Sequence, residues 1–201
     1  MTVRPPRSAL GRPVVLGVLF LWMAVATSSV ARAQADAWEL LRQPGIAVFM
    51  RHSEAPGSGG FGDPTGFRLE DCATQRNLSE EGRAHARRTG DAYRNHGVVF
   101  DRVLTSPWCR CKETAALALG KDAEIFEPLS NLVGRSENRE PQVRALKAYL
   151  ADLGTARALL VTHGIVIGAL TGINPASGEM VIVKPAPGGG EPRVVGRLRV
   201  D

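Results

Sequence analysis

The chain of 201 residues has few of the residues from which metal centres are built, with three cysteines and four histidines. The spacing of Cys72, Cys109 and Cys111 matches no standard zinc pattern, and a metal site built on them is an alternative that we keep open. Aromatic residues make up 5% of the chain, and no basic stripe of the sequence carries interleaved aromatics. This composition argues against a nucleic-acid partner.

Long apolar runs are also scarce, and the clearest one lies near the N-terminus. Three arginines precede the apolar segment 14–26, and an A-x-A cleavage site ends at Ala33. This order is typical of a secretory signal peptide, so we expect residues 1–33 to be removed and residues 34–201 to form the mature domain. The protein would then be periplasmic or secreted. The apolar run is short for a membrane span, so we expect no stable membrane insertion after cleavage, with an uncleaved anchor as the alternative.

Removal of the leader changes the charge of the protein. The leader holds four arginines and no acidic residue, so the net charge falls from +5 for the whole chain to +1 for the mature protein. The net positive charge of the full chain therefore does not indicate a nucleic-acid partner. The mature length suits one domain with a sizeable core.

The remaining sequence alternates between short apolar runs and longer segments with helical spacing. We expect strands at 46–50, 102–105, 124–126, 158–162, 180–184 and 194–200, the last two as a hairpin, and helices at 37–41, 80–95, 107–119, 141–153 and 165–171. Ser79 and Ser106 are the expected N-caps, and Gly120 is an expected helix end. This alternation predicts an α/β fold, a three-layer sandwich with a largely parallel central sheet.

Two histidines follow predicted strands directly, at the positions where ligands bind in such sheets. His52 follows Arg51 at the end of the first strand, and His163 follows Thr162 at the end of the fourth. A third segment, Ser106-Pro107, leads into a helix that carries Arg110 near its N-terminus, where the helix dipole favours anions. Two histidines and two arginines at neighbouring strand ends indicate phosphate chemistry.

These motifs resemble those of the histidine phosphatase superfamily, which includes the cofactor-dependent phosphoglycerate mutases. The resemblance rests on three motifs: the Arg-His pair at 51–52, the SPxxRxxxTA pattern around Arg110 and the Thr-His pair at 162–163. It spans residues 45–184. Ser53 stands where the family usually has glycine. The segment also resembles a secreted bacterial subgroup similar to lipopolysaccharide-core heptose phosphatases.

The resemblance implies a phosphoglycerate mutase-like fold and a metal-independent phosphomonoesterase that needs no cofactor. It assigns the nucleophile to His52, phosphate binding to Arg51 and Arg110, and stabilisation of the equatorial oxygens to His163. These residue types fit the chemistry, because arginine matches phosphate oxygens and a neutral imidazole can form a covalent intermediate. The expected substrate is small and phosphorylated, such as a sugar phosphate or an envelope glycan.

The resemblance also implies a carboxyl group that protonates the leaving oxygen, in the loop after the third strand. In this chain Ser130 and Asn131 follow Leu129, where the family often has glutamate. Glu137, further along the same loop, and Glu179, in the segment before the fifth strand, are the two candidates for this acid.

The sequence leaves several alternatives open. Export would place the cysteines in an oxidising space, so we expect a disulfide from Cys72 to either Cys109 or Cys111. His85 and His96 are expected to be exposed and without a role. The protein could also be a catalytically reduced phosphate-binding module, or a phosphoglycerate mutase-like phosphotransferase.

Overall fold

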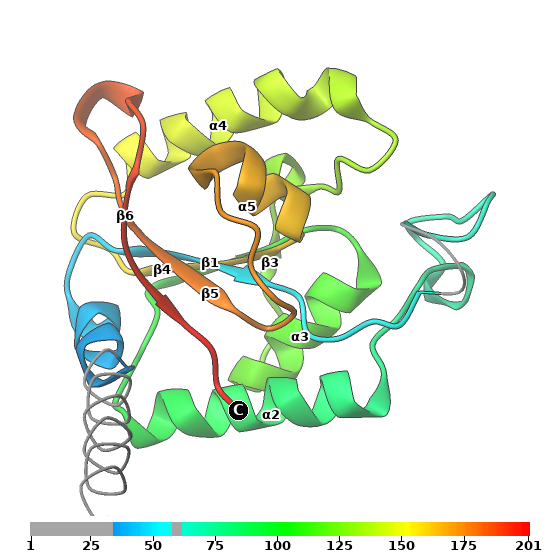
Figure 1. Cartoon of the computed structure of the whole chain (residues 1–201), viewed down its shortest axis with the longest axis horizontal. Coiled ribbons are helices and arrows are strands. Elements are labelled where there is room, and N and C mark those ends of the chain that lie inside the picture. The colour runs from blue at the N-terminus through cyan, green and yellow to red at the C-terminus, as the bar shows by residue number, and fades with distance from the viewer. Residues whose placement is uncertain (1–33, 58–61) are drawn as a thin grey trace, which may run out of the picture. The chain divides into compact units, whose positions relative to one another are not determined.

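A computed structural model describes residues 34–57 and 62–201, and residues 37–201 form a compact unit. The predicted leader lies outside the described residues. A six-stranded sheet forms the centre of this unit (Figure 1), with the strand order β3-β2-β4-β1-β5-β6. Its strands are β1 (Ala47–Arg51), β2 (Arg102–Thr105), β3 (Glu124–Ile125), β4 (Ala158–Thr162), β5 (Met180–Lys184) and β6 (Arg193–Leu198). The first four strands are parallel, whereas β5 and β6 run antiparallel to their neighbours.

Helices cover both faces of the sheet, which gives the expected three layers (Figure 1). The helices are α2 (Glu80–Asn95), α3 (Cys109–Leu119), α4 (Arg139–Ala151) and α5 (Gly164–Thr171), and residues 37–42 are also helical. Short 3-10 turns lie at η1 (Cys72–Thr74), η2 (Glu127–Leu129), η3 (Ser136–Asn138) and η4 (Pro187–Gly189). No helix within the described residues has the length and apolar character that a membrane crossing requires.

Alternate side chains of the central strands fill two separate cores. Val48 and Met50 of β1 point into the core beneath α2 and α3, and Ala47 and Phe49 point into the core beneath α4 and α5. All four side chains are buried, as is usual for a strand covered on both faces. A Cβ atom at Gly90 of α2 would lie 2.1 Å from the Ala118 carbonyl oxygen of α3, so this glycine permits the close approach of the two helices.

Most predicted elements are present, and the differences have local causes. The predicted bounds of α2, β2, β4 and β5 are confirmed, and β5 and β6 form the expected hairpin. The prediction that Ser106 caps α3 is wrong, because the helix begins at Cys109 and its N-cap is Trp108. Helix α4 begins two residues earlier than predicted, with Pro141 in its first turn, where the amide hydrogen is not needed for the helix.

Candidate active site

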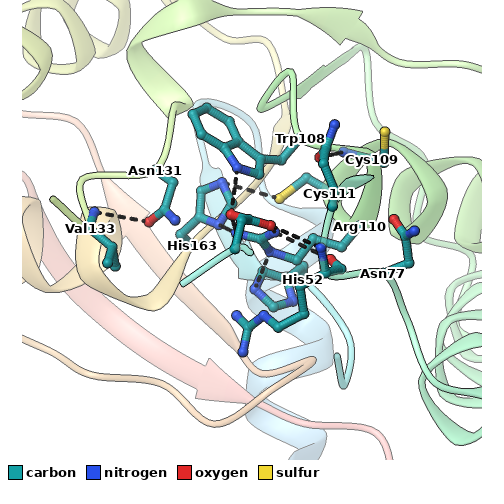
Figure 2. Close-up of polar contacts among 12 residues, drawn as sticks. His52, Asn77, Trp108, Cys109, Arg110, Cys111, Asn131, Val133 and His163 are labelled. Atoms are coloured by element: carbon teal, nitrogen blue, oxygen red, sulfur yellow. Dashed lines mark hydrogen bonds and ion pairs between the residues drawn. The ribbon is translucent and has the colours of Figure 1, made fainter. Parts of the chain in front are cut away.

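The parallel strands bring the two histidines together. Arg51 at the end of β1 pairs in register with Thr162 at the end of β4, so His52 and His163 leave the sheet side by side. Their ring centroids are 5.4 Å apart. Strand β2 lies on the other side of β4, and the turn after it places Arg110 of α3 against both histidines (Figure 2).

A pocket of about 530 Å³ opens over this group. It is lined by Arg51, His52, Gly57, Gly62, Arg76, Arg110, Asn131, Val133, His163, Gly164, Ile165, Asn174 and Pro175. Three of these residues are arginines and none is acidic, so the pocket is a strongly positive cavity suited to an anion.

The hydrogen bonds of His52 define its tautomer. Its Nδ1 lies 2.7 Å from the Ser53 carbonyl oxygen, which can only accept a hydrogen bond. Its Nε2 lies 3.2 Å from the Nε of Arg110, which can only donate. The proton is therefore on Nδ1, and the unprotonated Nε2 accepts from Arg110, a second residue that lines the pocket. Burial and the charge of Arg110 lower the pKa of His52 to about 3, so the ring is neutral at physiological pH.

His163 is buried and held by a different set of contacts. An Arg110 Nη donates to its Nδ1 at 3.4 Å, so the ring proton is on Nε2, which donates to the Ser106 hydroxyl at 2.9 Å. The Ser106 hydroxyl also accepts from the Trp108 amide at 3.4 Å, one residue before α3 begins at Cys109. Burial, the neighbouring His52 and Arg110 lower the pKa of His163, so this ring is also neutral in the unliganded site.

Arg110 is fully buried and pairs with Asp63 from the long loop after β1. The Asp63 carboxylate accepts hydrogen bonds from both terminal nitrogens of Arg110, at 2.7 and 3.3 Å. It also accepts from the Trp108 indole at 2.9 Å and from the Arg76 amide at 3.1 Å. Burial alone would raise the pKa of Asp63, but the hydrogen bonds and charge of Arg110 outweigh it and hold this pKa below its usual value.

The two other arginines of the pocket have unused donors. Arg51 donates to the Pro175 carbonyl oxygen at 2.9 Å, and the Nε atoms of Arg51 and Arg76 are buried without a hydrogen-bond partner among the described residues. Burial and the charge of Arg110 lower the pKa of both guanidinium groups. Asp63 and Arg76 are not predicted from the sequence, where their position in the long loop 53–77 is the only signal for them.

Ser53, which stands where the resembled family usually has glycine, is hydrogen-bonded to His85. The Ser53 hydroxyl donates to Nδ1 of His85 at 3.1 Å, while Nε2 of His85 donates to the Val200 carbonyl oxygen at 2.8 Å. The prediction that His85 is exposed is therefore wrong, because the ring is buried behind the site. His96 is exposed as predicted and stacks on Trp38, with ring centroids 4.1 Å apart.

The cysteines join the long loop to α3. Cys72 and Cys109 form a disulfide, one of the two pairings that the sequence left open. Cys111 is free and buried, 3.6 Å from His163, and burial raises the pKa of its thiol to about 12. Among the described residues, no group of three His, Cys, Asp or Glu side chains is placed to hold a metal ion.

Neither candidate acid lines the pocket. Glu137 lies in the exposed turn η3, outside the lining residues. The Glu179 carboxylate accepts hydrogen bonds from Arg197 at 2.7 Å and from the Ala176 amide at 2.7 Å. Burial would raise the pKa of Glu179, but these contacts lower it overall. The structure thus brings together Arg51, His52, Arg110 and His163 and leaves the carboxylates of the two glutamates outside the pocket lining.

Comparisons with known proteins agree with this geometry. Residues 47–133 match the model of the Histidine phosphatase superfamily (branch 1), a region that includes three of the four pocket residues named above. No curated protein matches the chain by sequence. Over residues 47–133 the chain is thus similar to members of the histidine phosphatase superfamily.

Several solved structures share the fold. One is the protein histidine phosphatase SixA complexed with tungstate, which is 20% identical with a TM-score of 0.55, over 77% of this chain and 96% of that one. Another is a phosphoserine phosphatase from Entamoeba histolytica, 15% identical with a TM-score of 0.53, over 77% of this chain and 97% of that one. A protein from Thermus thermophilus is 22% identical with a TM-score of 0.54, over 78% of this chain and 99% of that one.

Proposed function

We propose that the protein is an exported phosphomonoesterase that works through a phosphohistidine on Nε2 of His52. The observation that carries this proposal is the tautomer of His52. Its Nδ1 proton is held by the Ser53 carbonyl group, so the ring is neutral and its unprotonated Nε2 accepts from Arg110 in a pocket lined by three arginines. A phosphate that takes this Arg110 donor would free the lone pair for attack. A neutral imidazole with a free lone pair is the form that can attack phosphorus.

The charge of the pocket fits a phosphomonoester dianion. Arg51, Arg76 and Arg110 line the cavity, and Asp63 neutralises one of them, which leaves a net charge of two. The unused Nε donors of Arg51 and Arg76 can take phosphate oxygens as acceptors. The arginines thus supply the positive field that phosphoryl transfer requires.

The proposed reaction has two steps. His52 Nε2 attacks phosphorus, the bond from phosphorus to the ester oxygen breaks, and the leaving oxygen takes a proton from solvent water. Water then attacks the phosphohistidine, releases inorganic phosphate and returns His52 to its neutral form. His163 lies beside His52 and is placed to stabilise the equatorial oxygens as charge develops there.

The comparisons support the activity without naming the substrate. Two of the similar structures are described as phosphatases, and one of these holds tungstate, a tetrahedral oxyanion like phosphate. The leader at residues 1–33 supports export to the periplasm or the medium. The narrower resemblance to heptose phosphatases of the lipopolysaccharide core would make the substrate a sugar phosphate.

Turnover of para-nitrophenyl phosphate by the purified mature protein tests the activity. Release of inorganic phosphate should match release of the phenol, and it should survive chelator. Arg110→Ala should lower kcat/KM by about 10²-fold to 10³-fold, as for loss of a positioned donor, while the exposed Arg87→Ala should leave it unchanged.

Phosphate binding without turnover would favour a phosphate-binding module. Transfer to a second hydroxyl without free phosphate would favour a mutase.

A further inference from the structure

We infer that the substrates are aryl phosphates, esters whose leaving group is a phenol with a flat apolar ring. This inference rests on the proposed function and adds the class of leaving group to it. Two independent features of the pocket carry it. One is the lack of a proton donor, and the other is an apolar rim.

No carboxyl group is placed to protonate a leaving oxygen. The residues outside the described parts of the chain contain no Asp or Glu, so every acidic residue is accounted for in the structure. None of them lines the pocket. Asp63 is the carboxylate nearest to the reacting groups, and its oxygens already accept from Arg110, Trp108 and Arg76 with the pKa held low. In this state Asp63 is ionised and can only accept.

The position where the family often has its acid holds an amide. Asn131 is buried and lines the pocket together with His163 (Figure 2). Its Oδ1 accepts from the Val133 amide at 3.2 Å, so its NH₂ group is left to donate, and it has no hydrogen-bond acceptor among the described residues. An amide can hydrogen-bond to a leaving oxygen but cannot give it a proton.

A site of this kind favours a weakly basic leaving group. A phenol has a pKa of about 10, whereas the hydroxyl of an aliphatic alcohol ionises near the range of water, about 16. A phenolate can leave with its electron pair and take a proton from water afterwards, while an alkoxide needs a general acid in the transition state. General acids contribute typically about 10²-fold to 10⁴-fold.

The rim of the pocket supplies the second argument. The described residues include four exposed large hydrophobic side chains, and two of them, Val133 and Ile165, line this pocket. Val133 is 39% exposed and Ile165 is 40% exposed, one in the loop after η2 and the other in the first turn of α5. These two side chains form the exposed apolar part of the pocket lining, which we call its apolar rim. A phenyl ring on these side chains would bury apolar surface of both partners, whereas a sugar would place hydroxyl groups against them and lose their hydration.

Three substrates test the missing carboxyl group and the apolar rim separately. Phenyl phosphate carries the ring and the weakly basic leaving group, benzyl phosphate carries the ring on an aliphatic oxygen, and glucose 6-phosphate carries neither feature. We expect kcat/KM to be highest for phenyl phosphate, by about 10²-fold or more over benzyl phosphate, because only the latter needs the acid. We also expect benzyl phosphate to exceed glucose 6-phosphate, because its ring covers the rim.

Variants of the rim test the apolar contact separately. Val133→Ser and Ile165→Ser should each lower the ratio of kcat/KM for phenyl phosphate to that for glucose 6-phosphate by about 5-fold to 10-fold. The matched control is Val99→Ser, at a valine that is 62% exposed and does not line the pocket, and its ratio should equal that of the wild type.

The outcomes distinguish this inference from the proposed function. Equal kcat/KM for phenyl and benzyl phosphate, or a higher value for glucose 6-phosphate, would overturn the inference that the substrates are aryl phosphates. The proposed phosphatase activity would be unaffected by that result. An unchanged ratio in both rim variants would also overturn it. No turnover of any of the three esters would refute the phosphatase and the substrate class together.

Discussion

The carboxylate of Asp63 and the guanidinium of Arg110 form an ion pair that is shielded from solvent, with a contact of 2.7 Å between Nη1 and Oδ1. Asp63 comes from the long loop after β1 and Arg110 from the start of α3. The pair therefore fixes Arg110, which we propose binds phosphate, to a loop that contributes Gly62 and Arg76 to the pocket lining.

The first prediction concerns the stability that this pair provides. Asp63→Ala leaves the buried charge of Arg110 without its partner, so the free energy of unfolding should fall by about 3–5 kcal/mol. Urea denaturation of the oxidised protein measures this loss. Added inorganic phosphate should restore part of it by occupying the same guanidinium, and equal effects of phosphate on wild type and variant would contradict this account.

The second prediction follows from the neutral state of His52. Its folded pKa of about 3 lies below the ordinary value of 6.5, so the unfolded chain binds more protons between these values. The contribution of this residue to the free energy of unfolding is therefore full above about pH 6.5. It is lost as the pH falls toward 3, by about 1.4 kcal/mol per pH unit.

His52→Gln should reduce the slope of unfolding free energy against pH by that amount between pH 6 and pH 4, measured by urea titrations. The exposed His96→Gln serves as the control, and equal slopes for wild type and His52→Gln would mean that the folded protein holds this ring in its charged form.

The third prediction concerns the disulfide between Cys72 and Cys109, which closes a loop with a sequence separation of 37 residues. By the loop-closure model this crosslink stabilises the protein by about 3–4 kcal/mol. The double variant Cys72→Ala with Cys109→Ala should be less stable by this amount in denaturant titrations. Reductant should destabilise the wild type to a similar level and leave the double variant unaffected. A wild type that is insensitive to full reduction would show that the loop is held by its other contacts.

The fourth prediction concerns the two glutamates that the sequence suggested as acids. Because Glu137 is exposed and Glu179 is held by Arg197, Glu137→Gln and Glu179→Gln should retain kcat/KM for phenyl phosphate to within about 2-fold. Steady-state assays of both variants test this directly. A loss of about 10²-fold or more, as expected for removal of a general acid, would place that carboxyl group in the reaction.

The sequence predicted the parts of the site that follow regular structure. His52, His163 and Arg110 stand at the ends of strands or the start of a helix, where apolar periodicity shows the position of each element. The carboxyl ends of parallel strands meet at one edge of a sheet, so the proximity of these residues could be predicted from the sequence alone. The fold class could be predicted for the same reason.

The residues that the sequence did not indicate depend on the path of an irregular loop. Asp63 and Arg76 lie within loop 53–77, where no periodicity relates sequence position to direction in space. His85 was expected to be exposed because its helix is rich in arginine, yet its contacts with Ser53 and Val200 are long-range and bury it. The capping role expected of Ser106 failed because α3 begins at Cys109, so that Trp108 is the N-cap and Ser106 lies two residues before it.

The most direct test of the account is to trap the covalent intermediate. The mature protein is mixed with phenyl phosphate, quenched in base within the first turnover, digested and analysed by mass spectrometry. The account predicts a phosphoryl group on His52 that is stable in base and labile in acid, and that is absent from His52→Ala. Full turnover by His52→Ala, or a phosphoryl group on another residue in the wild type, would contradict it.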